Sequence, residues 1–342
     1  MPSEYDITIV GAGPAGCSAA HFLSRDYKVL LIDANKPPRD KPCGGILVEE
    51  ASEFIKKMNP PKKIFSSPKE LPLAILDWDN NLSVEQKRFL TNVNRKEFDY
   101  WLLENALKKI DFFAKTKLIS FSEKTDCVRL TVDKEGKSSD ISTRCLIGAD
   151  GANSSIRRSL STNLPKMYPC IQQWIKPKKN IDKIYFIFFK QVSDYYSWLI
   201  PKGEFLVMGA AIEDKKNVRT NFDIFKKDVK KKLGISGPAK KEEGAIGSRP
   251  MSEKDIFLGT KRILMVGEAA GLISPSTGDG ISFALRSGYN VAVALNSGLE
   301  NVDRGYRELS SQLIKEMRKK ISKSNLFLDA QKRPLLLEHL SK

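Results

Sequence analysis

The glycines near the N-terminus have a spacing that could bind a nucleotide. Gly11, Gly13 and Gly16 form a GxGxxG pattern, and Asp33 follows 22 residues after Gly11. In this pattern the first glycine permits a tight turn, the second lets the backbone approach a pyrophosphate, and the third allows close packing of helix and strand. An acid at the position of Asp33 can accept hydrogen bonds from an adenosine ribose. The spacing predicts dinucleotide binding; the alternative is a glycine turn of structural use only.

The segments around these glycines supply the context that the pattern requires. A β-branched strand is predicted over residues 5–10, an Ala-rich helix over 17–24 and a buried strand over 28–32. The order of strand, glycine turn, helix, strand and acid is that of a nucleotide-binding βαβ unit. The N-terminus of the predicted helix would place free N–H groups and partial positive charge under the phosphates. A carboxylate at position 33 disfavours the 2′-phosphate of NADP.

Two further glycine-rich segments follow predicted strands, at residues 148–158 (GADGANSSIRR) and 266–281 (VGEAAGLISPSTGDGI). The pair Gly278 and Gly280 precedes a long predicted helix and therefore indicates a second helix N-terminus directed at a ligand. Arg95 is expected in the first turn of another helix, where a cation is unfavourable unless an anion lies nearby. It is either a phosphate contact or an ordinary surface arginine.

The character of the chain changes between about residues 167 and 249. Aromatic strands are expected at 170–175, 184–189, 196–200 and 204–212, followed by a Lys-rich helix at 221–233. These segments predict an antiparallel sheet inserted as a second domain. An earlier β-meander over residues 117–147 would return the chain to the first domain.

Composition excludes several classes of protein. The 342 residues are 41% apolar, which is enough for a packed core, and the apolar runs are far shorter than the roughly 20 residues that span a bilayer. Five scattered cysteines without a CxxC pair argue against a disulfide framework or a metal site and favour a reducing cytoplasm. Acidic residues before the first apolar run argue against a signal peptide. With two histidines, catalysis is not expected to depend on histidine.

The net charge of +16 is concentrated in two segments, residues 213–241 and 304–342, each with a surplus of +6. Such an excess attracts phosphate-rich partners, such as anionic lipid headgroups or a diphosphate substrate, although a solvated Lys-rich surface would give the same count. No helix-turn-helix, zinc-finger or RNP-type pattern accompanies the charge, so specific nucleic-acid recognition is not expected.

The three glycine motifs and Asn94-Arg95 together resemble the FAD-dependent group that contains p-hydroxybenzoate hydroxylase and the geranylgeranyl reductases. Lys41-Pro42-Cys43-Gly44-Gly45 and the segment YSWLIPKG at 196–203 resemble motifs of the geranylgeranyl reductase family in particular. The resemblance implies an α/β fold: a Rossmann-like FAD-binding domain of the GR2 (p-hydroxybenzoate hydroxylase-like) type with an inserted antiparallel sheet. The expected FAD-binding domain comprises residues 1–60, 88–165 and 255–300, the substrate domain 61–87 and 166–254, and a C-terminal helical segment 301–342.

By this resemblance FAD is the cofactor, and its contacts include the backbone near Leu118 for the adenine. The implied cofactor-binding residues are Gly11, Gly13, Ala15, Gly16, Asp33, Cys43, Gly44, Gly45, Arg95, Leu118, Asp150, Gly267, Glu268, Gly278, Gly280 and Ile281. The implied substrate-binding residues are Tyr196, Trp198 and Pro201. Glu268 departs from the family, which usually has Asp there, and the chain is shorter than the typical lipid reductase. These departures predict a flavin that sits differently or binds more weakly and a truncated substrate tunnel.

The implied activity is reduction of carbon–carbon double bonds in a geranylgeranyl or other polyprenyl substrate, with Cys43 as the acid that protonates one carbon. Cys43 could equally be a small buried hydrophobe. The alternatives are an FAD-dependent monooxygenase, although a halogenase-like WxWxIP segment would need Trp at 196, and a flavin-binding sensor without turnover. The reductant is NAD(P)H or a ferredoxin. We expect a cytoplasmic protein with a lipid substrate, able to lie peripherally on an anionic membrane.

Overall fold

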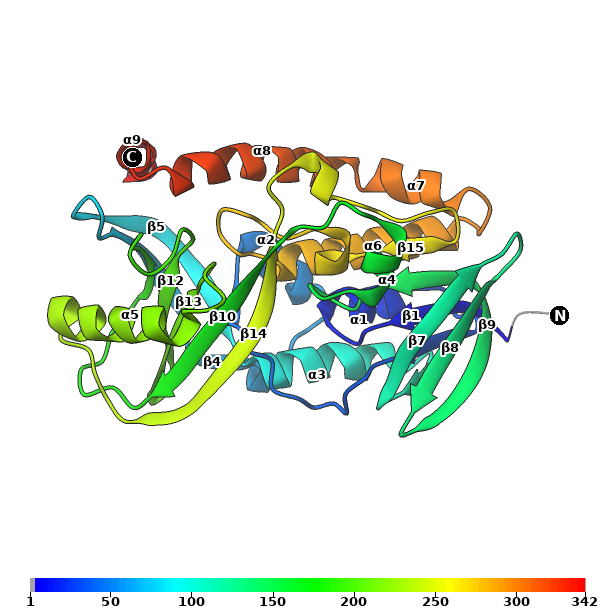
Figure 1. Cartoon of the computed structure of the whole chain (residues 1–342). Coiled ribbons are helices and arrows are strands. Elements are labelled where there is room, and N and C mark those ends of the chain that lie inside the picture. Colours follow the sequence, from blue (N-terminus) through cyan, green and yellow to red (C-terminus); the bar gives the residue numbers. More distant parts are fainter. Residues whose placement is uncertain (1–3, 342) are drawn as a thin grey trace.

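The computed structural model describes residues 4–341, which form two sheets joined by helices (Figure 1). The first sheet has a parallel part in which β1 (Tyr5–Val10) lies between β2 (Val29–Ile32) and β9 (Lys137–Gly148). The remaining parallel strands are β6 (Asp111–Phe113) beside β2 and β15 (Ile263–Met265) beside β9. The antiparallel strands β7 (Thr116–Glu123) and β8 (Val128–Lys134) extend β9 as the predicted meander.

Helices α1 (Pro14–Phe22), α3 (Arg95–Ala106) and α6 (Ile281–Asn296) pack together around α1 beside this sheet. The strands of the βαβ unit are almost entirely buried, which explains their continuous apolar sequence. Close packing of α6 on α1 requires Gly288, because a Cβ there would lie 2.8 Å from the Cβ of Ser18. The predicted Rossmann-like domain is therefore confirmed.

The second sheet has the strand order β14-β10-β13-β12-β11-β4-β5-β3. The bounds of its strands are β3 (Ile46–Leu47), β4 (Phe65–Asp77), β5 (Leu82–Val93), β10 (Lys166–Ile175), β11 (Ile184–Phe188), β12 (Ser197–Lys202), β13 (Phe205–Ala211) and β14 (Ala239–Arg249). All neighbours are antiparallel except β4 and β11, which pair in parallel and come from two separate segments of the chain. Helix α5 (Val218–Leu233), the predicted Lys-rich helix, packs against β10. We expected the first domain to resume at residue 88, but β5 of the second sheet continues through this residue to Val93.

The remaining helices connect these layers. They are α2 (Glu49–Lys56), α4 (Ser155–Leu160), α7 (Val302–Leu309), α8 (Ser311–Leu328) and α9 (Arg333–Ser341), with short 3₁₀ turns η1 (Lys62–Ile64), η2 (Glu253–Asp255) and η3 (Gly267–Ala270). The C-terminal helices α7 to α9 run along one side of the molecule from the first domain to the second sheet (Figure 1). Tyr306 and Met317 belong to the first core, whereas Phe327 and Leu337 pack on the second sheet. The C-terminal segment therefore connects the two domains.

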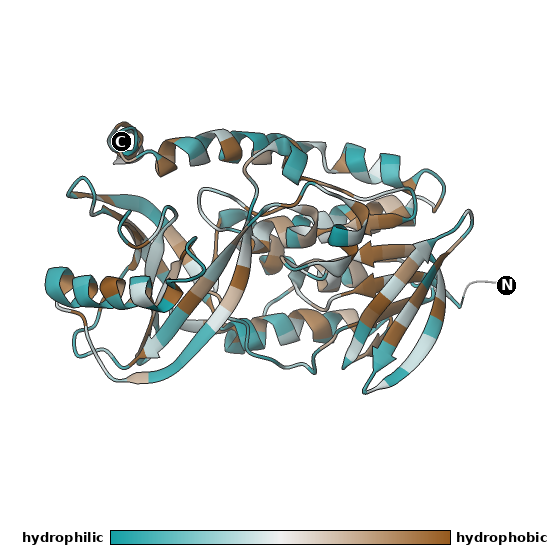
Figure 2. Ribbon diagram, in the orientation of Figure 1, coloured by the Kyte–Doolittle hydropathy of each residue, from teal (hydrophilic) through white to brown (hydrophobic). Residues whose placement is uncertain are grey.

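The distribution of hydropathy follows this arrangement. The strands of the first domain carry the densest apolar colouring, while α5 and α8 are mostly hydrophilic (Figure 2). Within residues 4–341, no helix combines the length and the apolar character needed to cross a bilayer.

A buried ion pair attaches α9 to the second sheet. The Arg333 guanidinium lies 2.8 Å from Asp77 and 2.9 Å from Asp79, and it also donates to the carbonyl of Phe327. We expect Arg333→Ala to lower the free energy of unfolding by about 3 kcal/mol, because it leaves a buried carboxylate without its partner. Urea denaturation measures this effect. The exposed neighbour Lys332 provides the control, and an Arg333→Ala curve that overlaps that of Lys332→Ala would contradict the assignment.

Candidate functional site

A cavity of about 700 Å³ lies between the two domains and is lined by residues of both. One end is formed by the glycine turn after β1, the other by aromatic strands of the second sheet. The volume is within the range of small-molecule and cofactor sites.

The glycine turn combines tight packing with open space. Gly11 has φ +109°, and a Cβ there would lie 2.7 Å from the carbonyl carbon of Ala149. A side chain on Gly16 would collide with the backbone of Gly11. By contrast, no atom lies within 4 Å of the place where a Cβ of Gly13 would stand, so the turn is open toward the cavity there. These are the conditions for a phosphate group against the N-terminus of α1.

Asp33 stabilises this turn and also faces the cavity. Its carboxylate accepts from the N–H groups of Ala12 and Asn35, each at 2.8 Å, and the Arg39 guanidinium lies 3.7 Å away. The side chain is almost completely buried in protein and lines the cavity. It is therefore held rigidly at the position expected for a ribose contact.

Asp150 lies at the turn between β9 and α4. One carboxylate oxygen accepts from the N–H of Ser155 at 2.8 Å, whereas the other is buried without a hydrogen-bond partner within the described chain. A buried carboxylate oxygen without a partner is energetically costly. Because this oxygen lies at the cavity, it indicates that a bound ligand donates a hydrogen bond to Asp150.

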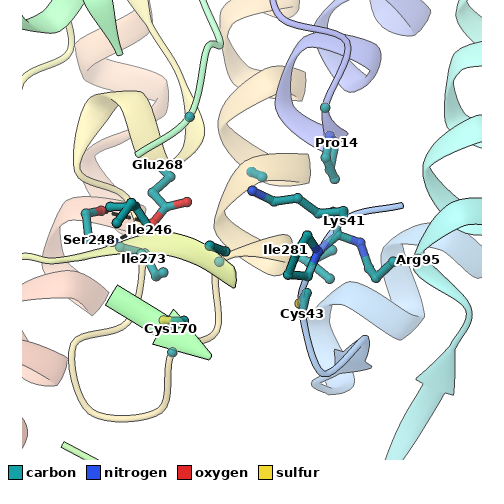
Figure 3. Close-up of a pocket in the computed structure, with 18 of the residues that line it drawn as sticks. Pro14, Lys41, Cys43, Arg95, Cys170, Ile246, Ser248, Glu268, Ile273 and Ile281 are labelled. Atoms are coloured by element: carbon teal, nitrogen blue, oxygen red, sulfur yellow. Dashed lines mark hydrogen bonds between the residues drawn. The ribbon is translucent and has the colours of Figure 1, made fainter. Parts of the chain in front are cut away.

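Glu268 lies in η3 and points its carboxylate into the cavity, opposite the extended side chain of Lys41 (Figure 3). Its Oε1 accepts from both the N–H and the hydroxyl of Ser248 on β14, at 2.8 and 3.1 Å. Burial raises its pKa, although Ser248 and Lys41 act in the opposite direction. Glu268, one methylene longer than Asp, thus joins the first domain to the second sheet, while its other oxygen has no hydrogen bond within the described residues.

The loop that contains Cys43 forms another side of the cavity, and Figure 3 shows Cys43, Lys41 and Arg95 across from Glu268 and Cys170. The Cys43 sulfur accepts from the N–H of Gly45 at 3.4 Å. Arg95 pairs with Asp99 at 2.7 Å within α3, which explains a cation in the first turn of the helix. Burial alone would lower the pKa of Arg95, but Asp99 and the neighbouring Cys43 raise it above its usual value.

The N-terminus of α6 closes the cavity between these groups. Gly280 caps the helix, and Asp279 beside it is buried, which raises its pKa to about 6. Tyr196 donates to the carbonyl of Thr277 at 2.7 Å and so fixes this turn. Residues 278–281 line the cavity, so the N-terminus of α6 lies beside it, where the helix dipole favours negative charge.

The far end of the cavity is apolar and aromatic. Its lining side chains, from β5, β10, β11, β12 and the residue before β12, include Leu90, Tyr168, Phe186, Tyr196, Trp198 and Ile200. The indole Nε1 of Trp198 is buried without a hydrogen-bond acceptor in the described chain. The aromatic lining suits a largely apolar ligand, and the unpaired indole N–H leaves a place for one hydrogen-bond acceptor.

Nearly all residues predicted for the site line this cavity. The exceptions are Gly16, Gly267 and Pro201. Gly16 and Gly267 permit close packing, since a Cβ on Gly267 would lie 2.8 Å from the Cβ of Ala15. The carbonyl of Pro201 accepts from the Asn92 side chain, and the proline lies behind the cavity wall.

Sequence patterns did not identify several residues that line the cavity. The main ones are Arg39, Arg88, Tyr168, Cys170 and Lys320. Arg249 was missed as well: it is fully buried, donates to the carbonyl of Pro275 and lies over the Tyr195 ring. These residues stand outside the glycine motifs, and Lys320 comes from the C-terminal segment, which no motif covers. No cluster of ligating side chains suited to a metal ion is found in residues 4–341.

Residues 4–178 match the model of the FAD binding domain family. The chain belongs to this family. It is also 29% identical over 328 residues to protein CbrA of an Escherichia coli O6:H1 strain, covering 94% of this chain and 89% of that protein. FAD is therefore the cofactor, and the chain is a member of the FAD-dependent oxidoreductase and monooxygenase superfamily.

Solved structures share the fold. A geranylgeranyl bacteriochlorophyll reductase-like protein from Thermoplasma acidophilum has a TM-score of 0.84 at 18% identity, covering 99% of this chain and 91% of that one. The flavin-dependent halogenase CmlS has a TM-score of 0.70 at 18% identity, covering 93% of this chain and 62% of that one.

The residues present fit FAD. The open Gly13 turn suits the pyrophosphate, Asp33 the adenosine ribose and the backbone near Leu118 the adenine. The unpaired oxygen of Asp150 and the free oxygen of Glu268 would accept from flavin hydroxyl groups. The N-terminus of α6 would favour negative charge on the reduced ring.

Proposed function

We propose that this flavoprotein reduces carbon–carbon double bonds of a polyprenyl chain that carries a phosphorylated headgroup. The observation that carries the proposal is the continuity of one cavity from the nucleotide-binding turn, past the Cys43 loop, to an aromatic wall. The likeness of the whole fold to a geranylgeranyl bacteriochlorophyll reductase-like protein supports the same substrate class.

We infer that the apolar end of the cavity opens between β5 and α8, because cations from both elements line it there. Arg88 and Lys320 line the main cavity, and Lys323 lines a smaller adjoining one of about 80 Å³ that also contains Phe186 and Phe188. Burial lowers the pKa of Lys323, and the positive charges of Arg88 and Lys320 lower it further. Lys320 has Glu316 at 3.6 Å, but no ion pair reaches Arg88 or Lys323 within the described residues. An anionic headgroup at this opening would relieve the repulsion.

The protein groups around the flavin have complementary roles in such a reduction. When bound, reduced FAD would supply the hydride that adds to one carbon of the double bond. The Cys43 thiol would donate its proton to the other carbon, and Arg95 would stabilise the resulting thiolate until solvent returns a proton. The aromatic side chains Tyr196 and Trp198 hold the chain and exclude water.

The basic opening makes a specific prediction about substrate recognition. We expect Arg88→Gln and Lys323→Gln each to raise KM for geranylgeranyl diphosphate about 10-fold, because each removes a charge-assisted contact worth roughly 1.5 kcal/mol. KM for geranylgeraniol should not change. Lys319→Gln is the control, since Lys319 is exposed on the same helix and does not line either cavity. Equal effects on both substrates would contradict a headgroup site.

The proposed activity is tested anaerobically with the FAD-loaded protein. After reduction with dithionite, geranylgeranyl diphosphate should restore the absorbance of oxidised flavin in the absence of oxygen. Reoxidation that occurs only in air would refute this substrate class. A monooxygenase would then be favoured if an aromatic substrate stimulates oxygen consumption, and a sensor if none does.

A further inference from the structure

Lys202, the last residue of β12, is buried and makes no ion pair with a carboxylate of the described chain. Its side chain is 7% exposed, and its ammonium contacts three neutral oxygens. They are the carbonyl of Val93 at 2.8 Å, the carbonyl of Gly45 at 3.3 Å and the side-chain oxygen of Asn92. A charged lysine has three N–H donors, so each donor has one acceptor.

Asn92 is arranged to serve this contact. The residue is fully buried on β5, and its amide nitrogen donates to the carbonyls of Pro68 at 2.9 Å and Pro201 at 3.0 Å. Both amide hydrogens are thereby used, and the remaining oxygen faces Lys202. The polar cluster therefore links β4, β5 and β12 behind the cavity wall.

The Cys43 loop rests directly on this cluster. Gly45 has φ +63°, and a Cβ there would lie 2.9 Å from the Lys202 nitrogen and 3.4 Å from the Arg95 side chain. The Gly45 carbonyl also accepts from the N–H of Val93 at 2.8 Å, and the Gly45 N–H donates to the Cys43 sulfur. A continuous series of contacts thus runs from Lys202 through Gly45 to the thiol in the cavity.

We propose that Lys202 is a positioning residue that holds the Cys43–Gly45 loop in place beside the flavin site. Lys202 does not line the cavity, so it acts through the loop. The consequence for alkene reduction rests on the proposed function, whereas the control of the loop does not.

The charge state of Lys202 decides the conditions of the test. Burial and, to a smaller extent, Arg95 lower the pKa of Lys202 to about 7, whereas Cys43 acts in the opposite direction. Arg95 is in turn paired with Asp99, the acidic side chain on that side. At pH 9 Lys202 is therefore neutral, and its amine still has N–H donors for the oxygens around it.

The test is the rate at which iodoacetamide alkylates Cys43, followed by peptide mass spectrometry in the FAD-loaded and FAD-free protein. We expect Lys202→Met to accelerate alkylation about 10-fold relative to the unsubstituted protein at pH 9, where Lys202 is neutral and its replacement removes no charge beside the thiol. Equal rates at pH 9 would overturn the proposal.

Two controls keep this experiment decisive. Lys183→Met removes a lysine that pairs with Glu85 away from the loop and should leave the Cys43 rate unchanged. Protection of the buried Cys17 and Cys145 in the same digest shows that the core is folded.

If Lys202→Met does not fold, Lys202→Gln tests the proposal in its place. Its shorter side chain should also accelerate alkylation of Cys43 at pH 9, and an unchanged rate would refute the proposal. Neither readout needs substrate or turnover, so the outcome is independent of the proposed reduction.

Discussion

Gly13→Asp is expected to give a folded protein that no longer retains FAD. Gly13 has φ −82° and ψ −179°, which any residue adopts, and its missing Cβ faces open space. An aspartate at the N-cap of α1 is also favourable for the helix. The new carboxylate would, however, occupy the space of the pyrophosphate. Repulsion of about 3 kcal/mol at close range corresponds to a dissociation constant raised roughly 100-fold.

The measurement is flavin absorbance per protein after purification and after titration with FAD, together with the melting temperature of the FAD-free protein. Gly13→Ala is the matched control, since it adds a Cβ without charge and should bind FAD more tightly than Gly13→Asp does. If Gly13→Asp retained FAD with unchanged affinity, the pyrophosphate could not lie at this turn. If it failed to fold, the open space at Gly13 would be wrongly assigned.

Cys43→Ala is expected to slow the reoxidation of reduced flavin by a polyprenyl diphosphate about 100- to 10,000-fold, the usual contribution of a positioned general acid. FAD binding should stay unchanged, because alanine removes only the sulfur from a half-buried position. Arg95, which faces the thiol and is paired with Asp99, would no longer have a thiolate to stabilise. Stopped-flow spectroscopy under anaerobic conditions measures this rate.

Cys170→Ala provides the control for that experiment. Cys170 lines the same cavity on the opposite side from Cys43 and Arg95, and burial raises the pKa of its thiol to about 12 (Figure 3). We expect Cys170→Ala to change the rate less than about 3-fold, since removal of the sulfur only enlarges the cavity slightly. Equal rates for the two alanine variants would show that the proton comes from elsewhere.

The sequence was most informative where a ligand constrains the backbone. The turn around Gly11 and Gly16 and the strand ending at Asp33 are local features, so their spacing predicted both the βαβ unit and the nucleotide site. The Lys-rich helix and the aromatic strands of the second sheet were likewise visible as local patterns. The parallel pairing of β4 with β11 was not, because it joins segments more than 100 residues apart.

Side chains that approach the site from distant segments were the least predictable. Lys320 reaches the cavity only because α8 crosses from the first domain to the second sheet. The role of Glu268 was uncertain from sequence, since its reach to Ser248 depends on how β14 packs against η3. Lys202 was part of a recognised motif, but its burial against Asn92 and Gly45 is a property of the tertiary structure alone.

The most direct test of the proposed reduction is the mass of the product formed anaerobically from geranylgeranyl diphosphate by the dithionite-reduced, FAD-loaded protein. We predict that each equivalent of flavin reoxidised adds two hydrogens to one double bond of the substrate. Cys43→Ala should form this product far more slowly while still binding FAD. Substrate recovered at its original mass, beside flavin that stays reduced until air is admitted, would contradict the reductase assignment.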